Sequence, residues 1–352
     1  MTSETSVGDS HLPCPICAHE ATLRFSGHPT FKKSEKRFDI YHCSECATAF
    51  ASPQEVDEDI YELIYRDGEQ VPGYGRYWRY QAAALKMSAP LAYLTEVEEG
   101  YWAVARVLQA EQARVSRPLR VLEVGSGLGY LTYSLSRHGF DATGIDISAH
   151  AVTLARRAFG DRYENCDLDS FRLRGEPFDV VIAVELIEHL ADPIAFIQRA
   201  RTLVRDEGLT ILTTPNRSDS PESVLWFTTC PPVHLWWFSE ESFTFLARRL
   251  ALALPEIVDY SSYYDGCFIL QSREDPPLPY HPTGEPTYDE SGHLIRKYET
   301  EGRAKSVSRE AARRLGLLRA LRRARRVLPS TRPIRSGARG RTCCAVFRGT
   351  LT

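Results

Sequence analysis

The sequence contains no run that approaches the roughly 20 consecutive apolar residues of a transmembrane helix. Its first ten residues, Met1 to Ser10, also lack the basic and apolar regions of a secretory signal peptide. These two absences argue against a membrane-spanning or secreted class, and we expect a cytoplasmic protein. The formal net charge of −3 and the hydrophobic content of 43% are those of an ordinary folded protein.

The cysteines do not form the even set of a disulfide framework. There are nine, and four of them form two Cys-x-x-Cys pairs near the start of the chain. The four cysteines are Cys14, Cys17, Cys43 and Cys46. Two such turns can complete a closed tetrahedral shell of four sulfurs around Zn²⁺. Residues 1–50 are therefore predicted to form a zinc ribbon with a structural metal and with strands near 22–25 and 37–42.

A glycine-rich turn dominates the middle of the chain. An apolar run at 120–124 is followed by Gly125, Gly127 and Gly129, and then by a helical pattern. A second strand-like run ends at Asp146, whose carboxylate can accept both hydroxyls of a ribose. A strand, a tight turn and a helix N-terminus in this order predict a site for an adenosine-type cofactor.

Two departures from the dinucleotide-binding pattern indicate which cofactor. Tyr130 stands where a third loop glycine would be needed, and Glu123 precedes the first glycine. A carboxylate there would repel a pyrophosphate but suits a ligand with an amino group and a sulfonium. The run Val-Leu-Glu-Val-Gly-Ser-Gly-Leu-Gly at 121–129, followed by Asp146, resembles motif I of class I S-adenosylmethionine-dependent methyltransferases.

The resemblance implies a fold and a set of cofactor contacts. The fold is α/β: a doubly wound, mostly parallel seven-stranded sheet, expected over 119–270. Strands are expected at 120–124, 141–146, 162–166, 178–184 and 208–213, with helices at 129–138, 149–159, 193–205 and 240–250. The implied cofactor-binding residues are Glu123, Gly125, Ser126, Gly127, Gly129, Asp146, Ile147, Asp167, Leu168 and Glu185.

Two histidines are candidates for the catalytic base, because imidazole titrates near neutral pH. His189 ends a Glu-Leu-Ile-Glu-His run after the fourth strand, where a structural or orienting role is an equal alternative. His234 lies among aromatic residues after the fifth strand, and the alternative there is a loop anchored by those aromatics. An Asn/Asp-Pro-Pro-Tyr/Phe run is absent at 184–187, which disfavours methylation of nucleic-acid amino groups.

The flanking regions carry weaker signals. Residues 51–118 are predicted to form a helical bridge, with helices near 55–65, 77–87 and 90–112 and with Tyr74, Arg76 and Tyr77 as lid candidates. Residues 296–341 hold sixteen Lys and Arg against three acidic residues, a local charge of +13 that leaves −16 for the rest. Residues 271–352 are predicted to form a basic insertion with a helix near 306–327 and a final strand at 342–348. This helix is expected to pack on the domain with a solvated basic face, to bind phosphates of an acidic acceptor, or to contact nucleic acid or a membrane. A strand at 267–271 is the alternative final strand.

Four-cysteine ribbons ahead of such a core resemble methyltransferases of sugar, polysaccharide and secondary-metabolite pathways. The resemblance implies methyl transfer to a hydroxyl or carbon of a small oxygen-rich acceptor, including nucleotide- or lipid-linked sugars whose phosphates could meet the basic region. An RNA methyltransferase that contacts RNA through the ribbon and basic region is the alternative. A non-catalytic cofactor-binding scaffold is the second alternative.

Overall fold

A computed structural model describes residues 10–29, 37–67, 74–219, 225–226, 231–265, 287–288 and 341–349. Among these residues no helix is both long and apolar enough to cross a bilayer. The predicted basic helix near 306–327 and the alternative strand at 267–271 fall outside the described residues, so both stay predictions. The division of the chain into four regions also stays a prediction.

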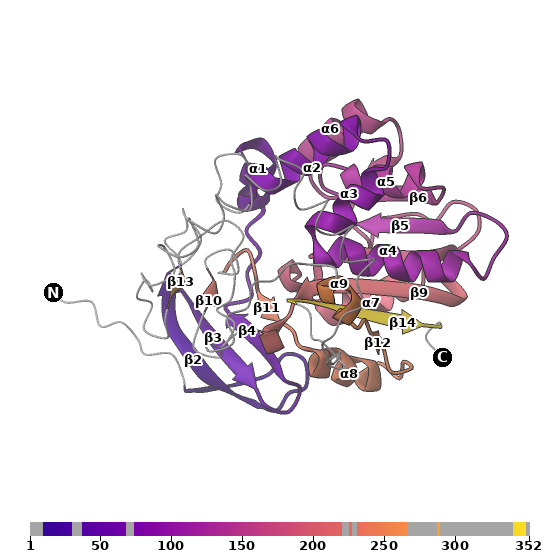
Figure 1. Cartoon of the computed structure of the whole chain (residues 1–352). Helices are drawn as coiled ribbons and strands as arrows, with labels where there is room; N and C mark the ends of the chain where they lie inside the picture. Colours follow the sequence, from indigo (N-terminus) through magenta and orange to yellow (C-terminus); the bar gives the residue numbers. More distant parts are fainter. Residues whose placement is uncertain are drawn as a thin grey trace.

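A seven-stranded sheet forms the centre of the molecule (Figure 1). Its order is β12-β14-β9-β8-β5-β6-β7, and the five strands from β9 to β7 are parallel, whereas β14 and β12 run antiparallel. The strands are β5 (Arg120–Val124), β6 (Asp141–Asp146), β7 (Tyr163–Asn165), β8 (Phe178–Val184), β9 (Val204–Pro215), β12 (Glu256–Ile257) and β14 (Thr342–Arg348). The predicted fold class is confirmed, and the run at 342–348 is an antiparallel strand of the sheet.

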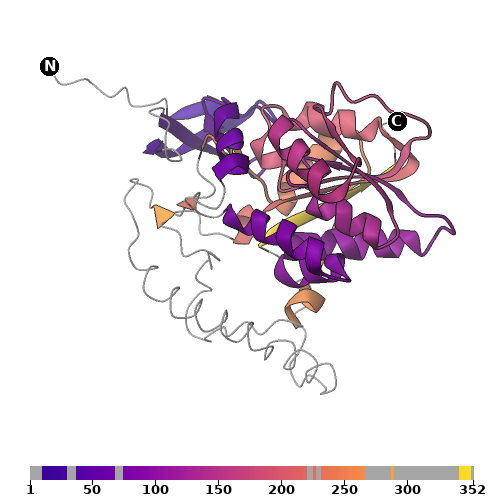
Figure 2. The ribbon, with the colours of Figure 1, turned by 90° about the horizontal axis from the view of Figure 1, so that it is seen from above.

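Helices cover both faces of this sheet (Figure 2). They are α2 (Gly75–Lys86), α3 (Pro90–Val97), α4 (Glu99–Gln112), α5 (Tyr130–Arg137), α6 (Ala149–Phe159), α7 (Pro193–Arg201), α8 (Glu240–Arg249) and α9 (Ser261–Asp265). The expected single helix at 90–112 is wrong, because Glu98 adopts an extended conformation (φ −136°, ψ 133°) between α3 and α4. The expected helix at 193–205 ends earlier, since β9 already begins at Val204.

Alternation along the strands assigns successive side chains to opposite cores. In β8, Val180 and Ile182 pack with α2–α5, while Val181 and Ala183 face the layer of α7 and α8. Cys343 and Cys344 likewise belong to different cores. The two neighbouring thiols therefore lie on opposite faces of β14, as the period of a strand requires.

The ribbon is a second sheet of order β1-β2-β3-β4-β11. Its strands are β1 (His11–Pro13), β2 (Glu20–Pro29), β3 (Arg37–Cys43), β4 (Thr48–Ser52) and β11 (Trp236–Trp237). β11 comes from the loop after β9 and pairs antiparallel with β4, placing Trp236 opposite Phe50. Ribbon side chains and core side chains form one continuous apolar cluster. The ribbon is thus packed into the large domain, as Figure 1 shows for β4 and β11.

The remaining elements are short. Helix α1 (Glu58–Asp67) lies between the ribbon and α6, and its Glu62 accepts a hydrogen bond from the Ser148 hydroxyl at 2.9 Å. The 3-10 helices are η1 (Ile187–His189) and η2 (Arg217–Asp219), and β10 (Leu225–Trp226) pairs with β13 (Thr287–Tyr288). Helix α1 brings its tyrosines to the carboxyl ends of the parallel strands.

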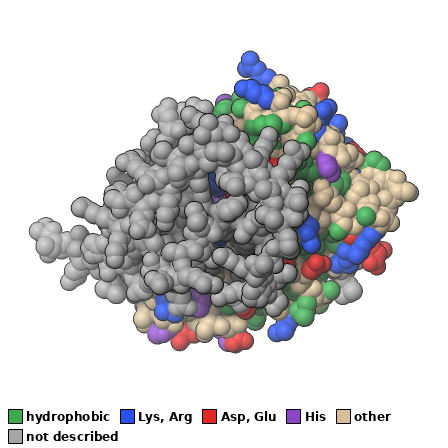
Figure 3. Space-filling view, in the orientation of Figure 1, with side chains coloured by type: hydrophobic (Ala, Val, Ile, Leu, Met, Phe, Trp, Pro, Cys, Tyr) green, Lys and Arg blue, Asp and Glu red, His purple; other side chains and the backbone are tan. Residues whose placement is uncertain are grey.

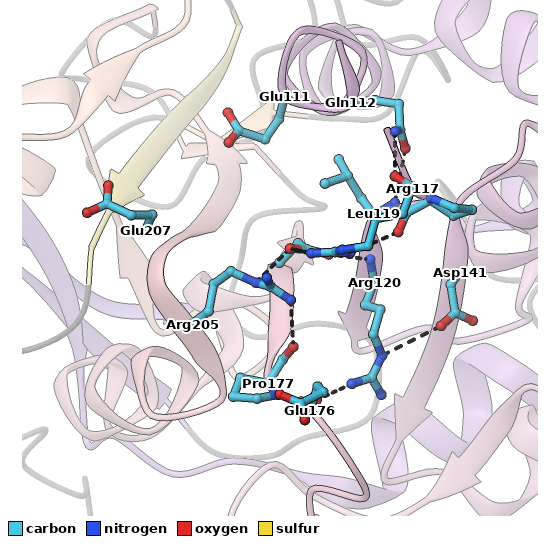
Figure 4. A network of polar contacts seen from close by, with 12 residues as sticks. Glu111, Gln112, Arg117, Leu119, Arg120, Asp141, Glu176, Pro177, Arg205 and Glu207 are labelled. Atoms are coloured by element: carbon cyan, nitrogen blue, oxygen red, sulfur yellow. Dashed lines mark hydrogen bonds and ion pairs between the residues drawn. The ribbon is translucent and has the colours of Figure 1, made fainter. Parts of the chain in front are cut away.

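A charged cluster ties the amino ends of the central strands together (Figure 4). Asp179 in β8 accepts two hydrogen bonds from the Arg117 guanidinium, at 2.6 and 2.7 Å, and one from the Arg120 backbone N–H at 2.8 Å. Nε of Arg205 lies 2.7 Å from the same carboxylate. Because Asp179 is only 5% exposed, its charge depends on these partners.

Asp179→Ala should lower the free energy of unfolding by about 3 kcal/mol, because it leaves two arginines beside a buried site without their carboxylate. Asp141→Ala is the matched control, since Asp141 is exposed and meets Arg120 only at 3.6 Å; its effect should stay within about 0.5 kcal/mol. Urea denaturation measures both. Equal effects of the two substitutions would contradict this account.

Candidate functional site

A cavity of about 410 Å³ opens at the carboxyl ends of the parallel strands. This edge is where open α/β sheets bind ligands. Nine of the ten residues that the sequence predicts for cofactor binding line it: Glu123, Gly125, Ser126, Gly127, Asp146, Ile147, Asp167, Leu168 and Glu185. The structure therefore brings together residues spread over more than 60 positions of the chain.

The tenth residue, Gly129, lies behind the cavity. It has φ +79° at the N-cap of α5, and a Cβ atom there would lie 2.7 Å from Ala155 and from Tyr163. Gly129 therefore permits close packing of the turn against α6 and β7. Gly127, by contrast, lines the cavity with φ +49°, a conformation that glycine adopts without strain.

Asp146 is held in a fixed orientation. Its carboxylate accepts hydrogen bonds from the backbone N–H groups of Gly127 at 2.7 Å and Ser148 at 2.9 Å. Burial raises its pKa, and the two N–H donors oppose that rise. The carboxylate oxygens have further acceptor capacity for two neighbouring hydroxyl groups.

Glu123 lies beneath the turn and is only 5% exposed. Burial raises its pKa to about 8, although the Thr132 hydroxyl donates a hydrogen bond to it. A carboxyl that is easily ionised by an approaching cation fits a ligand with a positive charge. At the strand end beside it, burial raises the pKa of Glu185 to about 7, which suits proton transfer near neutral pH.

Glu185 has an unusual backbone for a non-glycine residue, with φ +52°. Its N–H donates to the Thr213 carbonyl at 3.0 Å, and the Thr213 hydroxyl donates to Oε1 at 3.0 Å. The sharp turn after β8 therefore directs this carboxylate into the cavity.

Helices α1, α2 and α4 close the cavity with tyrosines and with an ion pair between Arg76 and Glu98. Tyr65 of α1 lies over the glycine turn, because a Cβ atom on Gly127 would be 3.0 Å from its hydroxyl. Arg76 lies over the Tyr77 ring at 5.0 Å, and its Nε is 3.5 Å from Glu98. The cavity-lining residues that the sequence does not predict as site residues include Tyr61, Ile64, Tyr65, Glu98, Tyr101, Tyr130 and Thr342.

The sequence contains part of the signal for these tyrosines, because aromatic residues are frequent over 51–118. The three residues predicted to form a lid, Tyr74, Arg76 and Tyr77, all line the cavity. Helical periodicity alone does not separate a tyrosine facing a cavity from one packed in the core. The pairing of Tyr101 with Tyr130, 2.5 Å between hydroxyl oxygens, forms only when α4 and α5 meet.

The two predicted catalytic histidines differ in position. His189 lines the cavity, whereas His234 lies behind it, 6% exposed, with its ring 4.6 Å from that of His189. Nδ1 of His189 donates to the Val233 carbonyl at 2.5 Å, so Nε2 is the nitrogen left to act. Burial lowers the pKa of His189 to about 4 and holds the pKa of His234 well below its ordinary value. Both rings are therefore neutral near neutral pH.

The four ribbon cysteines meet at one point. Their sulfurs lie within 4.8 Å of one another, with 3.6 Å between Cys14 and Cys46 and 3.4 Å between Cys17 and Cys43. Sulfurs around a tetrahedral zinc lie about 3.8 Å apart, given Zn–S bonds of about 2.3 Å. Ala18 and Ala47, which follow the two pairs, both have left-handed backbones, φ 62° and 53°. These two matching turns fit a structural zinc ion.

Comparison with known proteins gives the family. A family model described as a methyltransferase domain matches residues 98–254. Together with the seven-stranded sheet and its antiparallel last strand, this match decides the assignment. Residues 98–254 form a class I S-adenosylmethionine-dependent methyltransferase domain. The resemblance stated from the glycine turn is confirmed.

Curated relatives match this methyltransferase domain over a limited length. The ubiquinone biosynthesis O-methyltransferase of Cereibacter sphaeroides is 34% identical over 105 residues, which are 28% of this chain and 42% of that protein. The protein of the same description from Parvibaculum lavamentivorans is 32% identical over 133 residues, 36% of this chain and 51% of its own. The chain thus spans about half the length of the curated relatives it matches.

Solved structures include magnesium protoporphyrin IX methyltransferase from Synechocystis PCC 6803, with 17% identity and a TM-score of 0.36. It covers 58% of this chain and 91% of its own length. The plantazolicin methyltransferase BpumL has 12% identity, a TM-score of 0.41 and coverage of 85% and 92%.

The position of Glu123 predicts a pH-dependent stability. Its folded pKa of about 8 lies above the ordinary value of 4.5, so the folded state keeps a proton that the unfolded state loses. The stability from this group is complete below pH 4.5 and is lost as the pH rises through about 8. Glu123→Gln, which stays neutral, should therefore gain stability relative to the parent between pH 5.5 and 8.5. Denaturation at four pH values measures this difference, and a constant difference would refute it.

The ribbon predicts a metal-dependent stability. Cys43→Ser should lower the zinc content by one ion per chain and destabilise the methyltransferase domain, since β4 pairs with β11. Elemental analysis and thermal unfolding measure both. Cys166→Ser is the control, because Cys166 lies outside the cluster. Unchanged zinc content in Cys43→Ser would show that the cysteines hold no metal.

Proposed function

We propose that the chain is an S-adenosylmethionine-dependent methyltransferase that acts on a small, oxygen-rich acceptor. The acceptor atom is a hydroxyl oxygen or a carbon of a sugar, glycan or secondary metabolite, including nucleotide- or lipid-linked forms. The observation that carries the proposal is the single cavity that joins the glycine turn and Asp146 to Glu185, His189 and the tyrosine wall.

The donor half of the site fits S-adenosylmethionine. Asp146 can accept the two ribose hydroxyls, and Ile147 and Leu168 offer apolar surfaces for the adenine. Asp167 accepts a hydrogen bond from the Ser170 N–H at 2.6 Å and faces the same end of the cavity. Glu123, beneath the turn, is placed to favour the positive charge of the amino group and sulfonium. The bound donor would supply an electrophilic methyl group.

The part of the cavity left for the acceptor is lined by polar groups and by aromatic side chains. Carboxylates of Glu98 and Glu185, the Arg76 guanidinium and tyrosine hydroxyls surround it. Carboxylates and guanidinium groups bind hydroxyls, and aromatic rings pack against the flat faces of sugar or phenol rings. Both curated relatives cited above are described as O-methyltransferases, which supports oxygen as the acceptor atom.

Two side chains can remove the acceptor proton. Glu185 and His189 line the cavity, whereas His234 lies behind His189. Deprotonation creates the nucleophile, and the rigid turn that carries Glu185 aligns it for in-line attack on the methyl group. The tyrosines of α1, α2 and α4 exclude water from the reacting atoms.

The residues that the structure describes give no specific support to RNA as the acceptor. The ribbon pairs with β11 and shares the core of the large domain, and the basic region lies outside the described residues. Figure 3 shows basic and acidic side chains side by side on the described part of one face. RNA is therefore included among the acceptors to be tested.

Binding and turnover with labelled S-adenosylmethionine test the proposal, against nucleotide sugars, glycans, small hydroxylated metabolites and RNA. Label should pass to a hydroxylated small molecule. Asp146→Ala should weaken S-adenosylmethionine binding by about 10- to 100-fold, because two charge-assisted hydrogen bonds are lost.

Asp146→Asn keeps one acceptor oxygen, so it should lose less affinity for S-adenosylmethionine than Asp146→Ala. Asp161→Ala changes an exposed residue and is the control, which should bind S-adenosylmethionine as tightly as the parent protein does. Labelling of RNA alone would overturn the acceptor class. Tight donor binding with no turnover on any acceptor would favour a scaffold.

A further inference from the structure

Three side chains, two of them buried and one lining the cavity, meet at the junction of η1 and the loop before β11. They are Glu188, His189 and His234, and one potential ligand atom of each lies within 4.8 Å of the others. Glu188 is 1% exposed and His234 is 6% exposed. The two imidazole rings are nearly perpendicular, at 87°. The group is separate from the ribbon cysteines.

Three polar atoms of this group have no hydrogen-bond partner among the residues that the structure describes. They are both carboxylate oxygens of Glu188 and Nδ1 of His234, and all three are buried. Nε2 of His189 is 3.8 Å from Glu188 Oε1, beyond hydrogen-bond length. Leaving these three atoms unsatisfied in the interior is unfavourable for the folded state. A missing ligand that meets all of them at once removes this cost.

The donor set is that of a transition-metal site. Two imidazoles and one carboxylate bind Zn²⁺ and related divalent ions, with positions left open for a further ligand. The hydrogen bond from His189 Nδ1 to the Val233 carbonyl fixes the ring and leaves Nε2 to ligate, an arrangement that metal-binding histidines usually have. Ligand atoms around zinc lie about 3.4 Å apart, so the three side chains need to close by roughly 1 Å.

We propose that Glu188, His189 and His234 bind a divalent transition-metal ion, Zn²⁺ or a close analogue, as a second metal site of the chain. Since His189 lines the cavity, an open coordination position faces the acceptor half of the site. The ion would bind an acceptor oxygen and favour its ionised form, and Glu185 would take the proton. This use of the ion rests on the proposed function, whereas metal binding itself does not.

Metal content of the purified full chain, saturated with Zn²⁺ and then desalted, is the decisive measurement. We expect two zinc ions per chain in the parent protein, one from the ribbon and one from this site. His234→Ala and Glu188→Gln should each hold one, while His138→Ala, which changes an exposed histidine, should still hold two. The parent count decides the question even if a variant fails to fold.

Cobalt substitution separates the two sites by their ligands. The ribbon site should show thiolate-to-cobalt charge-transfer absorption, and the second site should show only the d–d bands of nitrogen and oxygen ligands. His234→Ala should remove the second set alone. One zinc ion in the parent, or two in His234→Ala, would overturn the inference. If the parent protein holds one zinc ion and still transfers the methyl group, the metal site is refuted and the proposed function stands. If it holds two zinc ions and shows no turnover, the metal site stands and the proposed function is refuted.

Discussion

The pairing of β4 with β11 is the contact on which the catalytic side of the molecule depends. It joins a small ribbon to a loop of the large domain through Trp236, which is 1% exposed and packs near Phe50. The same loop binds the turn after β8: the Leu235 N–H donates to the Glu188 carbonyl at 2.8 Å, and the Trp236 indole donates to the Leu190 carbonyl at 2.7 Å. The ribbon thus supports the segment that carries His234.

The charged residues at the two ends of the central sheet differ in how fully they are paired. At the amino ends Asp179 and its arginines satisfy one another, which holds the strands in register without a ligand. At the carboxyl ends the charged groups are left incompletely matched: Glu123, Glu185 and Glu188 all have raised pKa values because they are buried. Such buried carboxyls persist where a ligand completes them.

Strong periodicity and special residues made most of the fold predictable from the sequence. The glycine turn, the ribbon cysteines and the alternation in β5, β6 and β8 each reflect a local rule that needs no distant contact. Boundaries that depend on neighbours were harder. The break at Glu98 between α3 and α4 falls two residues before Gly100, which lies inside α4 and not at the break, and Tyr80, which donates to Glu98 at 2.5 Å, lies on another helix.

The sequence by itself determined the class of the domain and the type of donor, because motif I, Asp146 and the order of elements are properties of consecutive residues. Only the tertiary structure decided which side chains share the cavity. It showed Gly129 and His234 behind the wall, Tyr65 over the turn, and Glu188, His189 and His234 together. The physical reason is that burial and contacts between residues far apart in the chain depend on how sheet, ribbon and helices pack, which no local pattern specifies.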